Sequence, residues 1–521
     1  MTASGERRGR AAAPSELRRA GGLPAWLVGL PDPQRMRATD AWAIEARGIP
    51  GLELMERAGQ GLADAVTAMA PDGPVAVVCG KGNNGGDGYV AARLLREAGF
   101  EVRVLAVAGI DELRGDARAS AERVDAIEPF GPARLDGCAL AVDALLGTGF
   151  SGAPRGPIAD AVAALNGAGL PVVAADIPSG VDAASGAVEG EAVRAAATAT
   201  FAAAKPGLWI EPGKSHVGEV RVVDIGIPPG APVDEPDVGL IDDARLLALL
   251  SSRAPGWTKF TSGHVLVAGG SRGLTGAPSL SSEAAQRAGA GYVTACVPAS
   301  LETIFELRLL EAMTRGLPDE NGAHTAAGVD AVLELAARGG ALVVGPGIGR
   351  SDGAFAFARE LVARAQVAIV LDADGLNAHA GDLEALASRR APTVLTPHEG
   401  ELARLLDTDS DSVKARRLEH VRAAAARSRA IVLLKGDDTL VAQPDGLVAV
   451  SPGASAALAT AGTGDVLTGV IAAMLARGMD PFAATCAGVR LHARAGIHAA
   501  QEKGVDGVIA RDVIDALPFA R

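Results

Sequence analysis

Near the N-terminus the stretch "GKGNNGGDGYVAARLL" places glycine, asparagine and aspartate between an apolar run and a helix-like run. Three of its glycines make a formal G-x-G-x-x-G match: Gly80, Gly82 and Gly85. In a coenzyme-binding dinucleotide fold, an acidic residue ends the next strand and binds the ribose of NAD. The next strand-like run, "EVRVLAVAG" at 101–109, has no acidic residue at its carboxyl end. We therefore do not expect this stretch to hold NAD as a hydride-transfer coenzyme.

The same stretch has groups that could bind a phosphate or a cation. Backbone N–H groups at the start of a helix bind anions. Asn83, Asn84 and Asp87 add oxygen ligands of the kind that hard cations prefer. Asp143 and Ser179 follow two later strand-like runs, and the carboxyl ends of parallel strands meet at one edge of a sheet. The alternative is that the glycines make a tight turn and the polar residues cap the helix. Three polar stretches at one sheet edge favour a binding site.

Asp176, in "ADIPSGVD", also follows a strand-like run. A carboxylate at a strand end can act as a general acid or base in a reaction that removes and returns a proton or water. The competing interpretation is an aspartate that forms a turn or caps a helix before Pro178. Its position at the same predicted edge favours catalysis.

The C-terminal half offers a second set of residues suited to phosphate chemistry. In "TAGTGDVLTGVIAAML" glycines open a helix whose N–H groups can stabilise phosphoryl oxygens, and Asp465 stands beside them as a base. Lys435, in "LKGDDT", can bind phosphate, and Glu399 and Glu401, in "LTPHEGE", could position Mg²⁺. Alternatively, Asp465 only complements the helix dipole and Lys435 is a surface lysine. No G-x-x-x-x-G-K-[ST] sequence occurs, so this is not a P-loop enzyme.

Short apolar runs separated by helical lengths predict parallel sheets with right-handed crossovers. The runs lie at 75–80, 101–109, 140–149, 172–180 and 218–226, and again at 264–277, 341–349, 367–377, 393–401 and 431–439. Between the two groups, "IPPGAPVDEPD" at 227–237 is rich in proline and typical of a linker. We expect α/β domains at 33–228 and 240–521, a linker at 229–239, and a disordered extension at 1–32 without an assigned role.

Composition limits the classes of function. A formal charge of −13 argues against nonspecific binding to nucleic acid or anionic membranes, which need a basic surface. No apolar run is long enough to span a membrane. The four widely spaced cysteines are typical of reduced, mostly buried thiols, and the eight histidines show no zinc-binding spacing. We expect a cytoplasmic homo-oligomer that acts on small molecules.

Four N-terminal stretches, "LMERAG", "GKGNNGGDGYVAARLL", "VDALLGTGFSG" and "ADIPSGVD", resemble the NAD(P)H-hydrate epimerase domain over most of 35–228. The resemblance implies a Rossmann-like, doubly wound parallel sheet that interconverts the R and S forms of hydrated NADH and NADPH. It implies a K⁺ ion held by Asn84, Asp143 and Ser179. It also implies that the hydrated nucleotide contacts Asn83, Asn84, Gly85, Gly86, Asp87, Gly147, Thr148, Gly149, Phe150, Ser151, Gly152, Ala153 and Asp176. The glycine-rich stretch would then hold a damaged dinucleotide as substrate.

Stretches over 258–490 resemble the ribokinase-like superfamily and, within it, the ADP- or ATP-dependent NAD(P)H-hydrate dehydratases. They include "VVGPGIG", "LDADGLN", "LTPHEGE", "LKGDDT" and "AGTGDVLTG". The resemblance implies an α/β/α domain in which the terminal phosphate of the nucleotide turns the substrate hydroxyl into a leaving group. It implies that the hydrate contacts Ala277, Gly347, His398 and Asp465, with Asp465 as base. It also implies that ADP or ATP, with Mg²⁺, contacts Lys435, Gly436, Asp437, Asp438, Thr439 and Gly464.

Two alternatives remain open. The C-terminal half could be a kinase of a small, vitamin-type alcohol, because Asp465 would serve phosphoryl transfer in the same way. The N-terminal half could be a nucleotide-binding regulatory module without catalysis, although Asp176 beside the complete "NNGGDG" argues against it. The fusion of both halves in one chain favours nicotinamide nucleotide repair, since the two steps consume one pair of substrates.

Overall fold

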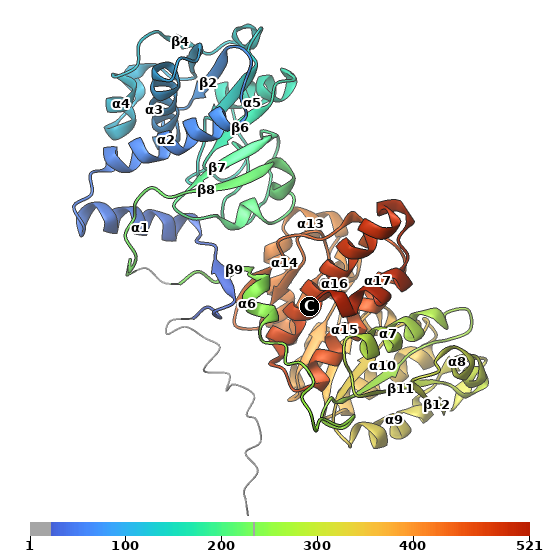
Figure 1. Ribbon diagram of the computed structural model, residues 1–521. Coiled ribbons are helices and arrows are strands. Elements are labelled where there is room, and N and C mark those ends of the chain that lie inside the picture. The colour runs from blue at the N-terminus through green and yellow to red at the C-terminus, as the bar shows by residue number, and fades with distance from the viewer. Residues whose placement is uncertain (1–21, 233–234) are drawn as a thin grey trace, which may run out of the picture. The chain divides into compact units, whose positions relative to one another are not determined.

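The computed structural model describes residues 22–232 and 235–521, which form two compact units (Figure 1). The N-terminal unit is built from Gly29–Val238. The C-terminal unit is built from Gly239–Val413 and Leu418–Arg521 together with the described residues that precede Gly29. Among the described residues, no helix is long and apolar enough to cross a membrane.

The N-terminal unit contains a seven-stranded sheet whose strand pairs are all parallel. From edge to edge the strands are β4 (Ile127–Pro129), β3 (Val102–Ala106), β2 (Val75–Cys79), β5 (Leu140–Ala144), β6 (Val172–Ala175), β7 (Ala197–Phe201) and β8 (Glu219–Val223). The central strands are short runs of valine and alanine that are buried on both faces, as expected for a parallel sheet covered by helices. The prediction of a doubly wound parallel sheet is confirmed.

Five helices accompany this sheet: α1 (Pro33–Glu45), α2 (Gly51–Ala68), α3 (Asn83–Glu97), α4 (Gly115–Ala121) and α5 (Pro157–Gly167). Side chains alternate between the two faces of a strand. Val75 and Val77 of β2 accordingly pack with residues of α2 and α3, whereas Ala76 and Val78 pack with residues of α5. The two faces of the sheet thus have separate apolar layers.

The C-terminal unit contains an eleven-stranded sheet. From edge to edge the strands are β1 (Leu27–Gly29), β9 (Val238–Ile241), β20 (Val448–Val450), β19 (Leu440–Ala442), β18 (Ile431–Leu434), β17 (Thr393–Leu395), β16 (Ala368–Leu371), β15 (Ala341–Val344), β10 (His264–Ala268), β11 (Tyr292–Pro298) and β12 (Met313–Leu317). The pairs from β12 to β18 are parallel, and β18, β19 and β20 pair antiparallel. β13 (Asp319–Glu320) and β14 (Ala323–His324) form a separate small hairpin.

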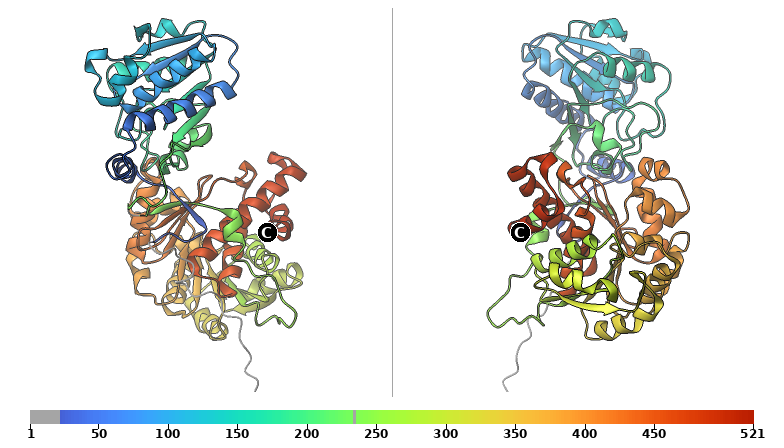
Figure 2. Two further views of the ribbon diagram at one scale, coloured as in Figure 1. Left: turned by 60° about the vertical axis from the view of Figure 1, so that its left-hand side comes forward. Right: turned by 90° about the vertical axis from the view of Figure 1, so that its right-hand side faces the viewer.

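Helices cover both faces of the C-terminal sheet, as the turned views show (Figure 2). They are α6 (Asp243–Leu247), α7 (Gly276–Arg287), α8 (Glu302–Arg308), α9 (Val329–Ala336), α10 (Asp352–Arg364), α11 (Asp374–Asn377), α12 (Glu399–Leu406), α13 (Ser410–Ala415), α14 (Arg417–Ser428), α15 (Thr463–Ala476), α16 (Pro481–Lys503) and α17 (Ala510–Ala516). With this sheet they form the predicted α/β/α arrangement.

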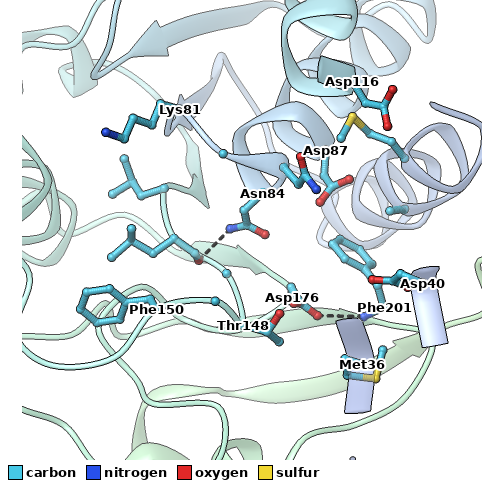
Figure 3. Close-up of a pocket in the computed structure, with 18 of the residues that line it drawn as sticks. Met36, Asp40, Lys81, Asn84, Asp87, Asp116, Thr148, Phe150, Asp176 and Phe201 are labelled. Atoms are coloured by element: carbon cyan, nitrogen blue, oxygen red, sulfur yellow. Dashed lines mark hydrogen bonds between the residues drawn. The ribbon is translucent and has the colours of Figure 1, made fainter. Parts of the chain in front are cut away.

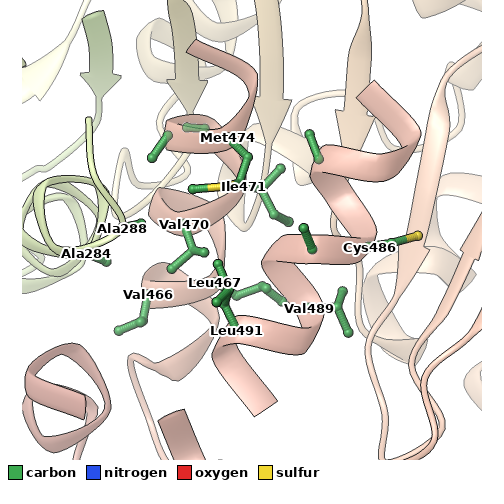
Figure 4. Close-up of a cluster of buried hydrophobic side chains, with 14 of the residues drawn as sticks. Ala284, Ala288, Val466, Leu467, Val470, Ile471, Met474, Cys486, Val489 and Leu491 are labelled. Carbon is green, nitrogen blue, oxygen red and sulfur yellow. The ribbon is translucent and has the colours of Figure 1, made fainter. Parts of the chain in front are cut away.

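Helix α15 lies in the core between α7 and α16 (Figure 4). Val466, Val470 and Ile471 of α15 are fully buried. A Cβ at Gly469 would lie 2.1 Å from the carbonyl oxygen of Ser281 in α7, so only glycine permits this close approach of the two helices. Tight packing along its length fixes where the first turn of α15 lies.

The prediction of a disordered extension over 1–32 is wrong for residues 22–32, while residues 1–21 lie outside the described residues. The apolar segment "LPAWLVGL" contains β1, which forms the edge of the C-terminal sheet beside β9. The N–H of Leu30 donates to the carbonyl of Val238 (2.9 Å), and the N–H of Asp242 donates to the carbonyl of Trp26 (3.0 Å). Trp26 is 3% exposed, so burial of its indole stabilises the order of this segment. The predicted linker 229–239 likewise ends inside β9.

All four cysteines are buried and none forms a disulfide, which confirms the prediction of buried thiols. The cytoplasmic location stays a prediction.

Candidate active sites

The N-terminal unit contains a cavity of about 790 Å³ beside the point where the strand order reverses. β2 and β5 are neighbours from which the chain winds outward in opposite directions, so the loops after them diverge and leave a crevice. The start of α3, the loop after β5 and residues following β6 and β7 line the cavity, together with α1 and α2 (Figure 3). Its volume is that of a small-molecule site.

The glycine-rich stretch forms the first turns of α3. The helix begins at Asn83 with Gly82 as its N-cap residue, and no side chain caps it. A Cβ at Gly85 would lie 2.0 Å from the carbonyl oxygen of Gly80, so the glycine lets the helix start directly at the strand end. The glycine, asparagine and aspartate residues that the sequence analysis places before the helix-like run, which begins at Tyr89, therefore already belong to the helix. An uncapped helix start at the cavity still favours an anionic ligand.

The three predicted K⁺ ligands lie together. Asp143, at the end of β5, is fully buried, and its Oδ1 accepts hydrogen bonds from Ser179 Oγ (2.6 Å) and the N–H of Leu145 (3.2 Å). Its Oδ2 accepts from the N–H of Ser179 (2.8 Å), and Asn84 Nδ2 donates to the carbonyl of Leu146 (2.8 Å). Burial raises the pKa of Asp143 to about 6, although the bonds from Ser179 lower it. In residues 22–232 and 235–521 no basic side chain forms an ion pair with this carboxyl, and a cation among these oxygens would compensate it.

Asp176 follows β6 and bonds across to β7. Its backbone is left-handed, with φ +64°, a conformation that aspartate tolerates better than most residues. Oδ1 accepts from the N–H of Phe201 (3.2 Å) and the hydroxyl of Thr200 (3.3 Å), and it forms an ion pair with Lys205. All of these partners lie on β7 or just after it, so the side chain of Asp176 does not cap a helix. Its backbone does form a tight turn, because the N–H of Ile177 donates to the carbonyl of Ala175 (2.8 Å). The carboxylate also lines the cavity.

Lys205 is a functional residue that the sequence analysis missed. Its side chain is 1% exposed, and Nζ also donates to Thr200 Oγ1 (2.9 Å) and the carbonyl of Phe201 (2.9 Å). A buried ammonium is costly unless it is paired, so Lys205 and Asp176 depend on each other. The signal in the sequence is a single lysine after the run "ATATFAAA".

Two further carboxyl groups, Asp40 of α1 and Asp87 of α3, line the same cavity (Figure 3). The pKa of Asp40 is raised to about 6, mainly by burial and secondly by the charge of Asp176, while the charge of Lys205 lowers it. Burial, and then Asp176 and Asp40, raise the pKa of Asp87 well above its ordinary value. The cavity therefore contains one carboxyl group, Asp40, that takes up a proton at about pH 6, and a second, Asp87, that keeps its proton to a higher pH than an ordinary aspartate does.

Most of the predicted substrate contacts gather at this cavity. A Cβ at Gly147 would lie 3.3 Å from Asn84 Oδ1, which shows how closely the loop after β5 approaches α3. The predicted residues that line the cavity are Asn83, Asn84, Asp87, Gly147, Thr148, Gly149, Phe150 and Asp176. Those that do not are Gly85, Gly86, Ser151, Gly152 and Ala153.

In the C-terminal unit, Lys435 follows β18 and pairs with a buried carboxylate. Its Nζ donates to Asp372 Oδ1 (2.7 Å), and the hydroxyl of Thr468 in α15 donates to Asp372 Oδ2 (2.7 Å). Burial lowers the pKa of Lys435, but Asp372 and Glu401 raise it overall. A Cβ at Gly464 would lie 3.3 Å from Lys435 Nζ, so the ammonium lies against the first turn of α15. The structure thus brings the predicted nucleotide contacts Lys435 and Gly464 together.

Asp465 is the third residue of α15. Its carbonyl oxygen accepts from Ser281 Oγ (2.9 Å) in α7, which ties the helix start to its neighbour. Burial, and then the Asp372 carboxylate, raise the pKa of Asp465 to about 7, while Lys435 lowers it. A carboxyl group with this pKa is poised to act as a base near neutral pH. Asp372 was not singled out from "LDADGLN", because the sequence does not show which aspartate faces Lys435.

The remaining predicted hydrate contacts lie at loop ends. His398 caps α12. Its ring nitrogen Nδ1 accepts from the backbone N–H of Gly400 (3.0 Å), and the backbone N–H of His398 donates to Glu401 Oε2 (3.0 Å). Gly347 has φ +65°, and a Cβ there would lie 3.4 Å from Ala277 Cβ, so these two residues are adjacent. Ala277 belongs to α7, which packs along α15.

The other predicted nucleotide contacts form the turn between β18 and β19. Thr439 Oγ1 donates to the carbonyl of Gly436 (2.6 Å), and Asp437 Oδ1 accepts from the N–H of Ala454 (3.2 Å). No three His, Cys, Asp or Glu side chains in the part of the chain that the structure describes gather as a metal site. That Glu399 and Glu401 help to position Mg²⁺ stays a prediction.

Comparison with known proteins agrees with this arrangement. The family described as YjeF-related protein N-terminus matches residues 51–207, and the family described as NAD(P)H-hydrate dehydratase matches residues 265–519. The chain is 40% identical over 502 residues to the bifunctional NAD(P)H-hydrate repair enzyme Nnr of Moorella thermoacetica, covering 93% of this chain and 95% of that protein. The chain belongs to the bifunctional NAD(P)H-hydrate repair enzymes. The Salinibacter ruber member of this family is 39% identical over 518 residues, covering 93% of this chain and 94% of that protein.

Among solved structures, the ADP/ATP-dependent NAD(P)H-hydrate dehydratase from Bacillus subtilis, co-crystallised with ATP and Mg²⁺, is 28% identical with a TM-score of 0.45. The match covers 53% of this chain and 95% of that chain.

Proposed function

We propose that this repair enzyme restores hydrated NADH and NADPH at two separate sites. The N-terminal unit interconverts the R and S forms of the hydrate, and the C-terminal unit dehydrates the S form at the expense of ADP or ATP. The observation that carries the proposal is the match to bifunctional repair enzymes along nearly the whole chain, with a site of suitable chemistry in each unit.

In the N-terminal unit, Asp176 is the acid or base that gives or takes a proton as the hydroxyl group on C6 leaves and returns. Its ion pair with Lys205 and its bonds from β7 support this role, because they hold a carboxylate in a fixed position in the cavity. The start of α3 binds phosphate of the dinucleotide. Asn84, Asp143 and Ser179 hold K⁺, a charge that favours the anionic substrate.

In the C-terminal unit, Asp465 takes the proton of the C6 hydroxyl, whose oxygen then accepts the terminal phosphoryl group of the nucleotide. Lys435 and the N–H groups at the start of α15 stabilise the negative charge of that group. The ring nitrogen lone pair expels the phosphorylated oxygen as phosphate and forms a C6=N1 bond. The departing phosphate takes the C5 proton, the C5–H electron pair forms the C5=C6 bond, and the N1–C6 π pair returns to nitrogen, which restores the dihydropyridine ring. Ala277, Gly347 and His398 contact the hydrate, and Gly436, Asp437, Asp438 and Thr439 contact the nucleotide. A homo-oligomeric state remains a prediction.

The test is to incubate the protein with racemic NADH hydrate, ADP, Mg²⁺ and K⁺ and to follow dihydronicotinamide absorbance. Full return of NADH, with one inorganic phosphate released per NADH, is expected. Conversion that stalls near half would show that the N-terminal unit does not epimerise. A product that keeps the phosphate would instead favour a kinase.

Two variants test whether the sites are separate. Asp465→Asn is expected to keep interconverting R and S hydrates while losing about 10²–10⁴-fold of NADH return. Asp176→Asn is expected to repair the S form at the normal rate and leave the R form behind. Loss of both activities in Asp465→Asn, with an intact circular dichroism spectrum, would contradict the division of labour.

A further inference from the structure

Asp40 is a carboxyl group in the N-terminal cavity to which the chemistry above assigns no role. It lies on α1, ahead of residues 51–207 that the family match covers. Figure 3 shows its side chain among those that line the cavity, together with Asp176 and Asp87. Residue 40 is half-buried, whereas Asp87 and Asp176 are 7% and 8% exposed.

Three carboxyl groups share this part of the cavity with one buried ammonium. Lys205 forms a direct ion pair with Asp176. Asp40 interacts electrostatically with Asp176 and Lys205, and Asp87 interacts with both aspartates. Arg37 and Lys81 also line the cavity, but both lie at exposed positions. The three carboxyl groups therefore share one buried positive charge, that of Lys205, and a carboxyl group beside Asp176 retains its proton. The remaining charged lining residues are Glu112 and Asp116.

Epimerisation at C6 needs two proton transfers on opposite faces of the ring. One group must protonate the hydroxyl as it leaves, and another must take a proton from the water that returns on the other face. A single ion-paired carboxylate can take the proton from the returning water but cannot protonate the leaving hydroxyl. Pairs of carboxyl groups whose surroundings drive their pKa values apart are the usual solution to such a requirement.

We propose that Asp40 is the catalytic acid that acts opposite Asp176, an inference that rests on the epimerase function proposed above. The Asp40 carboxyl donates its proton to the C6 hydroxyl, the C6–O bond breaks, and water leaves. The ring nitrogen lone pair forms the C6=N1 bond of an iminium ion. A water molecule then adds to C6 on the opposite face, and its proton passes to Asp176. The N1–C6 π pair returns to nitrogen.

After this turnover Asp40 is ionised and Asp176 is protonated. The reverse conversion of S to R uses the two groups in exchanged roles and restores both. Turnover in one direction instead needs proton exchange with solvent at both groups, which takes place through the cavity that Asp40 and Asp176 line. Asp40 is more exposed than Asp87, which favours Asp40 as the carboxyl group that solvent reprotonates in each cycle.

The test measures epimerisation as the slow second phase of NADH return from racemic hydrate, after the S form has been consumed. Asp40→Asn keeps the size of the side chain and is expected to lower the second phase by about 10²–10⁴-fold without changing the first. The pKa of Asp40, raised by burial and by Asp176 to about 6, gives the wild-type second phase a decline as pH rises through about 6, measured with excess Asp176→Asn variant so that dehydration does not limit the rate at low pH. Asp40→Asn should lose this decline, and Asp40→Glu, which restores an acid, should regain it.

Glu45→Gln is the matched control, because it removes a charge from an exposed position on the same helix and should leave both phases unchanged. An Asp40→Asn variant that keeps more than a tenth of the second phase, or that keeps the same decline with pH, would overturn the proposal. So would a loss that Asp40→Glu does not reverse while thermal unfolding of both variants matches the wild type. NADH return that stalls near half in the wild type would instead refute the epimerase function itself.

Discussion

The ionisation of Asp465, the proposed base of the C-terminal site, should make dehydration slower as pH decreases. Burial and the Asp372 carboxylate raise the pKa of Asp465 to about 7, and a base works only in its ionised form. The rate with the S hydrate should therefore be constant above pH 8 and fall as pH decreases through about 7. At pH 6 only about a tenth of Asp465 is ionised, so the rate should be roughly tenfold below its plateau.

Asp372→Asn tests the cause of this shift. It removes a negative charge that raises the pKa of Asp465, so the midpoint of the acid limb should move to lower pH. The assay is initial dihydronicotinamide absorbance from pure S hydrate with saturating ADP between pH 5.5 and 8.5, corrected for decay without enzyme. Asp465→Asn should show a residual rate without the limb. A limb that persists in Asp465→Asn, or that moves to higher pH in Asp372→Asn, would refute the assignment of Asp465 as base.

Two other predictions concern the ion and the N-terminal segment. Asp143→Ala should weaken epimerisation and abolish its response to K⁺ while leaving dehydration of the S form unchanged; an unaltered K⁺ response would remove the ion from the site. Trp26→Ala should destabilise the C-terminal unit by about 3–5 kcal/mol, measured as the denaturant midpoint for loss of dehydratase activity, because it empties a buried aromatic site against Phe482. Val28→Ala, at a side chain 48% exposed, should have little effect, and equal losses in the two variants would contradict the role of β1.

The sheet strands beside both sites were predictable from the sequence because they are short apolar runs at regular spacing. β2, β5 and β6 begin at the predicted residues, and β10, β15 and β18 lie inside the predicted runs. The start of α3 was not predictable in the same way. Glycine has low helix propensity, yet close packing against the end of β2 makes "NNGGDG" helical. β1 was missed because three residues gain stability only from a sheet edge formed by β9, over two hundred residues away.

The candidate sites were predictable where polar residues directly follow strands. Asp143, Ser179 and Asn84 come together as the carboxyl-edge argument requires, and Lys435 lies against Gly464. Lys205 and Asp372 could not be found by the same argument. Each is the buried partner of a predicted residue, and burial of an ion pair depends on packing that a local pattern does not contain.

The two sites share one electrostatic arrangement, although their loop sequences differ. In each, a lysine pairs with one carboxylate, the buried Lys205 with Asp176 and the partly exposed Lys435 with Asp372, and a second carboxyl group beside the pair has a raised pKa. One ammonium between two carboxyl groups leaves the second without compensation, which separates an acid from a base. The roles are opposite, since Asp40 acts as protonated acid and Asp465 as ionised base.

Opposite roles give opposite pH dependences. Epimerisation should decline as pH rises through about 6, and dehydration should decline as pH falls through about 7. Repair of racemic hydrate should therefore be fastest between these values, with dehydration limiting below them and epimerisation limiting above. The Asp176→Asn variant dehydrates but does not epimerise. Adding it to a wild-type reaction should accelerate repair at pH 5.5 and have no effect at pH 8. Acceleration at pH 8 instead would show that the acid and base assignments of the two sites are reversed.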